Sequence, residues 1–408
     1  MIKDVTQVPR EELLELAEER IFSLGLRDLA SVLAYENMRY ALGRMIYALE
    51  NDDVYCVLAP DATITRNKPR WLSGYGYGGV IRWSDENVAF PEIRPNACGM
   101  LLMRLDNLPS KKDLVKRASE VEEKELELNG VKINPDFGRG NHFFELYKPL
   151  EISEEVSDVL PPDAFYAVLH SSAPELKDKM YSWAEKGEKV NTPLGYITIL
   201  KNSAAREYYK DWEKLKEFSK RRRELLAREV VGEHEVVSNF IHQGLFAPNE
   251  ARLGCYNTTE QEEDGLFPVA LRWDFPVHVL RGKPNLSDEV IHRLEFQERA
   301  ERLGLEEELR NVNTLPHGGG YKIQLPYQKI DITTTSFGNV FTLSGLKPAS
   351  TMSEISEGKA ISEFGGMAIT DPHSLPYTYR GEAVIGKTID LGLGDPVAKL
   401  RPVLTVKI

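Results

Sequence analysis

Three short stretches of the sequence carry side chains that could bind a metal ion. His142 follows Asn141 and precedes Glu145 by three residues, directly after a glycine-rich turn. Cys98 and His170 each stand beside an apolar run, where the end of a strand would deliver them. One thiolate and two neutral imidazoles suit zinc, and also manganese where oxygen ligands complete the shell. The sequence therefore predicts a metal site formed by Cys98, His142 and His170.

The overall composition is that of a globular protein. The chain has 408 residues, 42% of them hydrophobic, which is enough for a sizeable core. No window approaches the roughly 18 to 20 apolar residues of a membrane span, and the N-terminus does not read as a signal peptide. The 3 cysteines are widely spaced and odd in number, which fits a reducing compartment. We therefore expect a cytoplasmic protein that makes no contact with membranes.

The net charge of −12 disfavours nonspecific binding to nucleic acid, which needs clustered cations. One basic run, at residues 214–228, stands out against this background. Glutamates interleave with its lysines and arginines, so the run fits a solvated helix with ion pairs four residues apart. It fits a phosphate-facing surface as well, and the sequence leaves both interpretations open.

Hydrophobic periodicity predicts the elements that must position these side chains. Two helices are expected between residues 9 and 50, and short β-rich runs between 54 and 104. Further helices are expected at 111–128, with Ser110 as the N-cap, at 203–230 and at 287–310. No repeat or low-complexity linker divides the chain. We expect an α+β fold in which β-sheets flanked by helices form one large domain over residues 53–408, preceded by an N-terminal helical extension over residues 1–52.

Several segments form a series that runs along most of the chain. Its members are Ala-Pro-Asp at 59–61 with a glycine-rich stretch at 74–80, Asn-Ala-Cys-Gly at 96–99, Gly-Asn-His-Phe-Phe-Glu at 140–145, Leu-His-Ser-Ser at 169–172 and the closing strand at 397–407. In this order they resemble the motifs of the RtcB family of RNA-splicing ligases. The resemblance implies an RtcB-like fold over the domain from residue 53 onward.

The resemblance also implies an activity. Members of the family use GTP and manganese to join an RNA 2′,3′-cyclic phosphate or 3′-phosphate end to a 5′-hydroxyl end, as in tRNA splicing. A histidine is guanylylated, passes GMP to the RNA 3′-phosphate, and the 5′-hydroxyl then attacks. The expected cofactors are thus a divalent metal, Mn²⁺ or Zn²⁺, and GTP. The expected partners are RNA ends, from tRNA-like or repair substrates, and a guanine nucleotide.

The family motifs assign roles to individual residues. Cys98, His142 and His170 match three ligands of one family metal. Residues that match nucleotide-binding positions of the family are Asn141, Glu145, Tyr379 and Lys407.

Two parts of the family pattern are not kept. Pro95 stands where the family has an aspartate ligand of its second metal, and Ser238 stands where the family has a histidine before asparagine. Either Ser238 takes the place of that histidine or His242 serves from a shifted register. The guanylylated histidine could be His317, which precedes three glycines, or the motif could fall at residues 350–353, where no imidazole is present.

These departures leave two further interpretations beside an active ligase. The chain could be a noncatalytic relative that binds one metal together with nucleotide or RNA ends. It could also be a single-metal phosphoesterase in which an activated water replaces the lost nucleophile. Glu145 is the only general base that the sequence offers for such a reaction.

Overall fold

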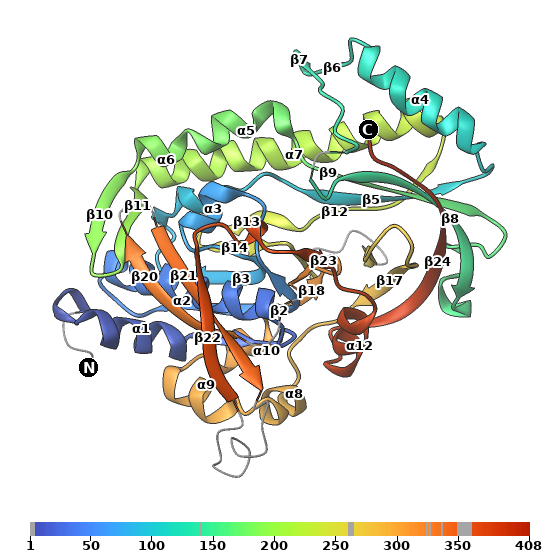
Figure 1. The fold of residues 1–408 in the computed structure, drawn as a ribbon. Helices are drawn as coiled ribbons and strands as arrows, with labels where there is room; N and C mark the ends of the chain where they lie inside the picture. The colour runs from blue at the N-terminus through green and yellow to red at the C-terminus, as the bar shows by residue number, and fades with distance from the viewer. Residues whose placement is uncertain are drawn as a thin grey trace.

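The computed structural model describes residues 5–138, 140–259, 265–323, 325, 328–335, 338–348 and 361–408. Arg139 and the alternative nucleophile stretch at 350–353 lie outside these residues. Figure 1 shows a mixed arrangement in which α5, α6 and α7 lie along one side of the sheets and α8, α9 and α10 lie on the opposite side. None of the helices in the described part of the chain is long and apolar enough to cross a membrane. The mixture of helices and sheets agrees with the predicted α+β class.

A seven-stranded sheet provides the frame of the site. Its order is β12-β5-β9-β8-β24-β17-β16, and all neighbouring strands run antiparallel. The strands are β12 (Glu235–Ile241), β5 (Gly99–Leu105), β9 (Phe165–Ser171), β8 (Phe143–Ile152), β24 (Gly394–Val406), β17 (Val277–Gly282) and β16 (Leu266–Val269). Met100 and Phe143 both pair with His170. The residues just before β5 and β8 therefore meet the end of β9.

A five-stranded sheet stands beside it, with the order β1-β2-β3-β14-β13. Its strands are β1 (Ile21–Ser23), β2 (Val54–Thr63), β3 (Tyr77–Trp83), β14 (Glu250–Leu253) and β13 (Gln243–Ala247). All ten residues of β2 are buried, because side chains on its two faces enter two different hydrophobic clusters. A strand buried on both faces reads as a nearly continuous apolar run.

The N-terminal segment differs from a helical extension. Its two predicted helices are present as α1 (Arg10–Glu19) and α2 (Leu29–Leu49), and Asp28 caps α2 by accepting hydrogen bonds from two backbone N–H groups. Strand β1 lies between them and pairs in parallel with β2. Leu13, Met38 and Met45 are fully or almost fully buried in the main core. The N-terminal segment thus adds strand β1 to the five-stranded sheet and buries side chains of its helices in the main core.

The long predicted helices have mixed outcomes. Helices α4 (Lys111–Glu123), with the predicted Ser110 cap, and α7 (Ser203–Val231) are present. The prediction of one helix at 287–310 is wrong, because that segment forms α8 (Asp288–Arg293), α9 (Gln297–Leu303) and α10 (Glu306–Arg310). Glu295 and Gly304 take left-handed backbone conformations, with φ of 58° and 67°, and these interrupt the helical path.

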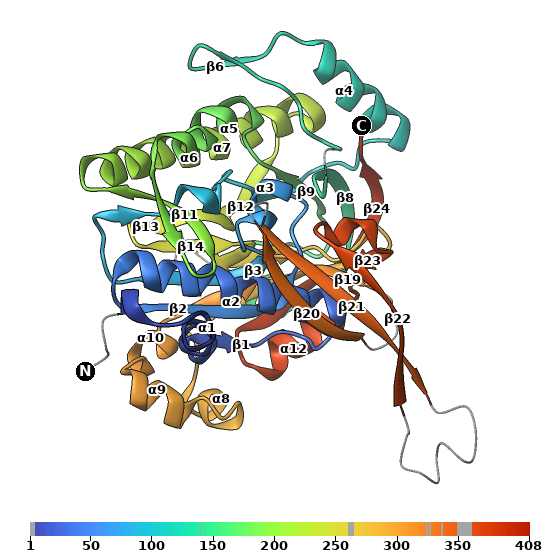
Figure 2. The same ribbon diagram turned by 60° about the vertical axis from the view of Figure 1, so that its left-hand side comes forward.

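Smaller elements complete the fold. The strands β20, β21 and β22 form a three-stranded sheet that projects from the body in Figure 2. The bounds of the remaining elements are η1 (Val5–Gln7), α3 (Lys68–Leu72), β4 (Val88–Ala89), η2 (Pro91–Ile93), β6 (Glu127–Leu128), β7 (Val131–Lys132), η3 (Glu154–Val156), α5 (Pro174–Tyr181), α6 (Trp183–Lys186), β10 (Glu188–Thr192), β11 (Gly195–Lys201), β15 (Cys255–Asn257), β18 (Thr314–Pro316), β19 (Tyr321–Ile323), β20 (Gln328–Thr335), β21 (Gly338–Pro348), β22 (Ile361–Ile369), η4 (Pro372–Ser374), β23 (Tyr377–Tyr379) and α12 (Ala383–Asp390).

Candidate metal centre and the cavity above it

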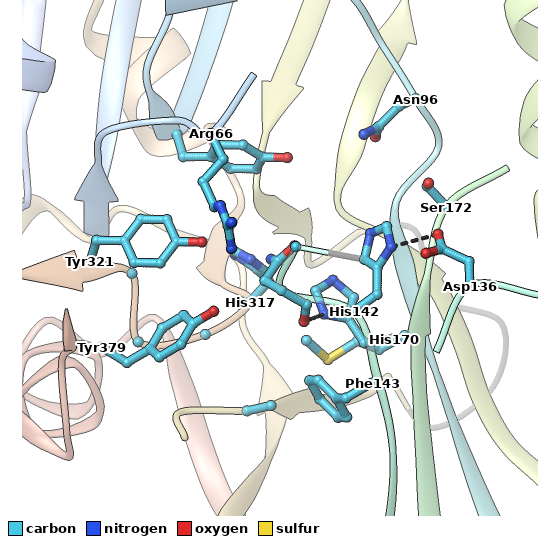
Figure 3. A pocket seen from close by; sticks show the side chains of 18 of the residues that line it. Arg66, Asn96, Asp136, His142, Phe143, His170, Ser172, His317, Tyr321 and Tyr379 are labelled. Atoms are coloured by element: carbon cyan, nitrogen blue, oxygen red, sulfur yellow. Dashed lines mark hydrogen bonds and ion pairs between the residues drawn. The ribbon is translucent and has the colours of Figure 1, made fainter. Parts of the chain in front are cut away.

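A cavity of about 750 Å³ opens at the end of the seven-stranded sheet where β5, β8 and β9 meet. It brings together residues that lie far apart in the sequence, and Figure 3 shows side chains from several elements turned toward it. The predicted site residues that line it are Asn141, His142, Glu145, His170, His317, Tyr379 and Lys407. Cys98 and His242 are buried, and each contacts a histidine of this lining.

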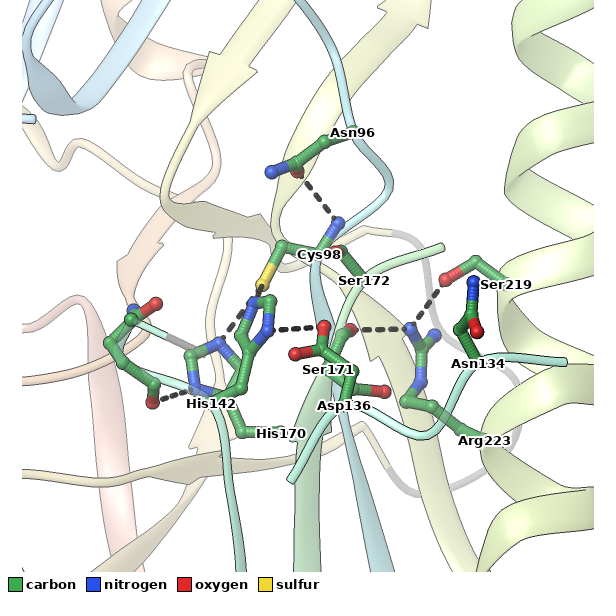
Figure 4. A network of polar contacts seen from close by, with 12 residues as sticks. Asn96, Cys98, Asn134, Asp136, His142, His170, Ser171, Ser172, Ser219 and Arg223 are labelled. Atoms are coloured by element: carbon green, nitrogen blue, oxygen red, sulfur yellow. Dashed lines mark hydrogen bonds and ion pairs between the residues drawn. The ribbon is translucent and has the colours of Figure 1, made fainter. Parts of the chain in front are cut away.

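The predicted ligands Cys98, His142 and His170 form a compact group (Figure 4). The Cys98 Sγ atom lies 3.3 Å from His142 Nε2 and 3.1 Å from His170 Nε2. With about 2.3 Å from zinc to sulfur and about 2.0 Å to nitrogen, tetrahedral ligand atoms stand roughly 3.6 Å apart. The spacing is therefore close to that of a metal site, and the group could hold a cation after a small expansion.

Both imidazoles are oriented by a second contact. His142 Nδ1 lies 2.6 Å from Asp136 Oδ2, and His170 Nδ1 lies 3.0 Å from the Asn141 carbonyl oxygen. A carboxylate and a carbonyl only accept, so each Nδ1 carries a hydrogen, and each Nε2 faces the sulfur. Such contacts are the usual support for metal-binding histidines. A cation at the centre would bind the sulfur and both Nε2 atoms, in place of any proton on them.

Asp136 was not identified from the sequence. The sequence shows only that Asp136 stands six residues before His142, in a stretch that also contains proline and glycine. The structure makes it the buried partner of that histidine, with a relative exposure of 2%.

Charge is distributed unevenly among the histidines. Burial lowers the pKa of His142, but the Cys98 thiolate and the Asp136 carboxylate outweigh this effect and raise the pKa to about 9. Burial, followed by the neighbouring His142 and His317, holds the pKa of His170 well below its usual range. Burial and the same crowding by imidazoles lower the pKa of His242 strongly. His170 and His242 are thus neutral near pH 7, with lone pairs available.

His242 joins the centre from the junction between β12 and β13. Its Nε2 lies 3.3 Å from His170 Nε2, and its backbone N–H donates to the Cys98 carbonyl at 3.0 Å. Ser238 pairs with Leu102 further along β5, whereas His242 belongs to a candidate group of ligands with His170 and His317. Of the two alternatives for the missing family histidine, the geometry favours His242. Pro95 offers no side-chain ligand atom.

His317 lies in a second candidate group together with His170 and His242. Its Nδ1 lies 2.5 Å from the Gly254 carbonyl oxygen and 3.0 Å from Asp61 Oδ2, so this nitrogen donates and Nε2 keeps its lone pair. The glycine that ends the turn, Gly320, has φ of 62°, and a Cβ there would lie 2.4 Å from the Asp61 carbonyl oxygen. Gly320 thus allows this turn to approach β2 closely.

The predicted nucleotide-binding residues surround the same space. Glu145 accepts hydrogen bonds from Tyr147 and Thr405, both at 2.7 Å, yet its burial raises the pKa to about 7. Lys407 donates to the Gly140 carbonyl at 2.9 Å, and burial lowers its pKa. Tyr379 packs on Tyr321 in β19, with ring centroids 5.0 Å apart.

The basic run of α7 has a role that neither interpretation of the sequence foresaw. Arg221 forms a surface ion pair with Glu217 at 2.6 Å, as a solvated helix would. Arg222 and Arg223 are fully buried and bond to the segments that carry the candidate metal ligands. Arg222 donates to the Ser172 carbonyl, and Arg223 donates to the carbonyls of the residues next to Cys98 and His170. These two arginines therefore hold the strand ends in position.

The cavity is basic although the chain is acidic. Arginine and lysine side chains line it from several elements, and Arg272 at its edge is paired with Asp274. Among the described residues, no carboxylate lies within ion-pair distance of the lining cations Arg66, Arg70, Arg94, Lys177 and Lys407. Unpaired cations gathered around one cavity favour an anionic ligand.

Fold and site together define a buried Cys/His centre beneath a basic and aromatic cavity, in a mixed α+β protein. Comparison with protein-family models finds no match, and comparison with curated protein sequences finds none either.

Proposed function

We propose that this protein is an RtcB-like RNA ligase, which joins 2′,3′-cyclic phosphate or 3′-phosphate RNA ends to 5′-hydroxyl ends with GTP and a divalent metal. The observation that carries the proposal is the placement of His317. Its imidazole, oriented by Asp61, lies in the cavity formed by the metal-capable group and by the residues assigned to the nucleotide. Segments separated by most of the chain supply these parts, and they meet around one cavity.

His317 is the nucleophile in the proposed first step. Its Nε2 lone pair forms a bond to the α-phosphorus of GTP, the bond from that phosphorus to the bridging oxygen breaks, and pyrophosphate leaves. The Nδ1–H stays bonded to Asp61 and Gly254, and Asp61 stabilises the positive charge that develops on the ring. A 2′,3′-cyclic phosphate end must first be opened by water to the 3′-phosphate. An oxygen of that 3′-phosphate then attacks the phosphorus of the adduct, and the bond from phosphorus to Nε2 breaks. Finally the 5′-hydroxyl attacks the activated RNA phosphorus and gives up its proton to the solvent, while GMP leaves.

The bound metal would supply charge neutralisation at the phosphoryl oxygens. Cys98, His142 and His170 would hold it. Asn141 and Glu145 offer polar groups for the nucleotide, and Glu145 provides an acceptor for guanine N–H donors once it is ionised. Lys407 adds a cation at the same wall. These roles follow the family resemblance, and the common cavity supports them.

The test is transfer of GMP from α-labelled GTP to the protein in the presence of manganese or zinc. We expect a covalent adduct that is labile in acid, as a phosphoramidate is, and that is lost in His317→Ala. His292→Ala, which changes an exposed histidine of α8, is the matched control and should keep the adduct. No adduct with any metal would refute the proposal.

Two further measurements separate the alternatives. A noncatalytic relative would bind one metal and a nucleotide without forming the adduct. A phosphoesterase would release phosphate from a cyclic-phosphate RNA end without GTP and without joining. Metal content should be measured with and without GTP, and ligation should be followed with one RNA that ends in a cyclic phosphate and one that begins with a 5′-hydroxyl.

A further inference from the structure

One tryptophan of this protein is exposed at the edge of the cavity. Trp273 has a relative exposure of 68%, whereas Trp71, Trp83, Trp183 and Trp212 have 8% or less. Trp273 nevertheless contributes to the cavity lining. We propose that it is the platform on which an unpaired nucleobase stacks near the end of the RNA strand that enters the cavity. This inference rests on the proposed function and adds to it the site that recognises a single-stranded end.

The loop that carries Trp273 is fixed next to the proposed nucleophile. It joins β16 to β17, and the Ala270 N–H donates to the His317 carbonyl at 3.2 Å. Ala270 also forms a β-bridge with Gly318. On the other side of the tryptophan, the Phe275 N–H closes a turn on the Arg272 carbonyl at 2.9 Å. A base that stacks on Trp273 would therefore lie close to the segment that delivers His317.

The surroundings of Trp273 combine aromatic faces with positive charge. The neighbouring Arg272 guanidinium lies 4.6 Å from the centre of the Phe275 ring and is paired with Asp274. Elsewhere in the cavity lining, Arg66, Lys177 and Lys407 have no carboxylate within ion-pair distance among the residues the structure describes.

Flat aromatic surfaces beside unpaired cations are the combination that binds single-stranded nucleic acid, because bases stack while phosphates meet the cations. The exposed indole of Trp273 offers a large flat face with which a base could stack. The single-stranded character follows from the geometry of stacking, since a base must leave a duplex before an aromatic side chain can cover its face.

Intrinsic fluorescence tests this inference directly, since Trp273 is the only exposed tryptophan. The probe is a short single-stranded RNA that ends in a 3′-phosphate, titrated into the full chain. We expect the RNA to quench the acrylamide-accessible part of the tryptophan fluorescence in a saturable way. Trp273→Phe should show no such quenching by the RNA. Stacking of one base corresponds to roughly a fivefold to 150-fold change in affinity.

Binding of a fluorescently labelled RNA, followed by anisotropy, gives the second readout. Kd should rise by about tenfold in Trp273→Ala and by less than about threefold in Trp273→Phe, which keeps an aromatic face. The matched control is Tyr196→Ala, since Tyr196 is an aromatic residue with 46% exposure outside the cavity lining. Thermal unfolding of each variant verifies that it folds.

The outcomes separate this inference from the proposed function. Adduct formation from GTP without RNA quenching would overturn the stacking site and leave the proposed function standing. Quenching and the predicted Kd changes without the adduct would do the opposite. An unchanged RNA affinity in Trp273→Ala would overturn the inference. If Trp273→Ala kept its RNA affinity but lost self-association, Trp273 would be a contact between protein molecules, and the inference would again be overturned.

Discussion

The contact between Asp61 and His317 allows a quantitative prediction for Asp61→Asn. The substitution keeps the shape of the side chain and removes its charge. The His317 Nδ1–H has two acceptors, the Gly254 carbonyl at 2.5 Å and Asp61 Oδ2 at 3.0 Å. The carbonyl alone still fixes the tautomer in which Nε2 holds the lone pair. What the variant loses is the negative charge beside a ring that becomes cationic when it bonds to phosphorus.

The size of the effect follows from that distinction. A hydrogen bond to a charged group contributes about 1.5 to 3 kcal/mol. If Asp61→Asn removes this contribution from the transition state, the rate of adduct formation falls by roughly 10-fold to 150-fold. Replacing the carboxylate of a serine-protease triad, which also disturbs the tautomer, costs about 10⁴-fold. The Gly254 carbonyl should prevent that larger loss.

The assay is single-turnover transfer of GMP from labelled GTP, with GTP and metal at saturating concentrations so that binding does not limit the rate. Asp178→Asn is the matched control, because Asp178 also lines the cavity but has no hydrogen bond to His317. A rate for Asp61→Asn within twofold of the wild type would show that the charge plays no part. A loss near 10⁴-fold would show that the carbonyl does not hold the tautomer.

Three other predictions follow from the same geometry. Asp136→Asn should weaken metal affinity by roughly 10-fold to 100-fold in a competition titration with a chelator, because Asp136 orients His142; an affinity equal to that of the wild type would contradict this. Burial raises the pKa of Glu145 to about 7, so its carboxylate gains charge between pH 6 and pH 8. GTP affinity should then rise by about tenfold over this interval and lose that dependence in Glu145→Gln; a slope that persists in the variant would assign it to another group. Arg222→Met should lower the free energy of unfolding in urea by about 3 to 5 kcal/mol, because it leaves Glu175 buried and unpaired, while Arg221→Met, which breaks an exposed pair, should cost about 0.5 kcal/mol or less; equal losses would refute this account.

The sequence allowed prediction of those parts of the site that depend on local pattern. Cys98, His142 and His170 each adjoin an apolar run, so strand ends deliver them, and three neighbouring strands of one antiparallel sheet place those ends together. Helices α4 and α7 were predictable from periodicity and capping for the same reason. The family fold and activity suggested by the resemblance stay predictions.

Contacts between distant segments could not be predicted in this way. Asp61 and His317 are 256 residues apart, and no local pattern pairs them. The burial of Arg222 and Arg223 was hidden because their helix carries many charges, and periodicity does not reveal which cations meet backbone carbonyls. The break of the segment 287–310 into three helices depends on the left-handed conformation of Glu295, which its residue type does not signal.

The lone pair of His170 limits what the centre can hold. The His170 Nδ1–H donates to the Asn141 carbonyl, so only the Nε2 lone pair can bind a cation. That single lone pair faces both Cys98 Sγ and His242 Nε2. An imidazole nitrogen binds one cation, whereas a thiolate sulfur has further lone pairs. An ion held by Cys98, His142 and His170 would therefore leave a second ion with the sulfur and His242.

Among the described residues, few other side chains near His242 and the sulfur could bind that second ion. Pro95 has no side-chain ligand atom, and one lone pair of the Asn96 side-chain oxygen accepts the Cys98 N–H at 3.0 Å. Taking His317 as a ligand would use the lone pair that the proposed chemistry needs. The remaining ligands would have to be oxygen atoms, and the phosphates of a bound nucleotide are the nearest chemical source. The protein alone should hence contain one metal per chain, and a second should appear only in the metal content measured with GTP.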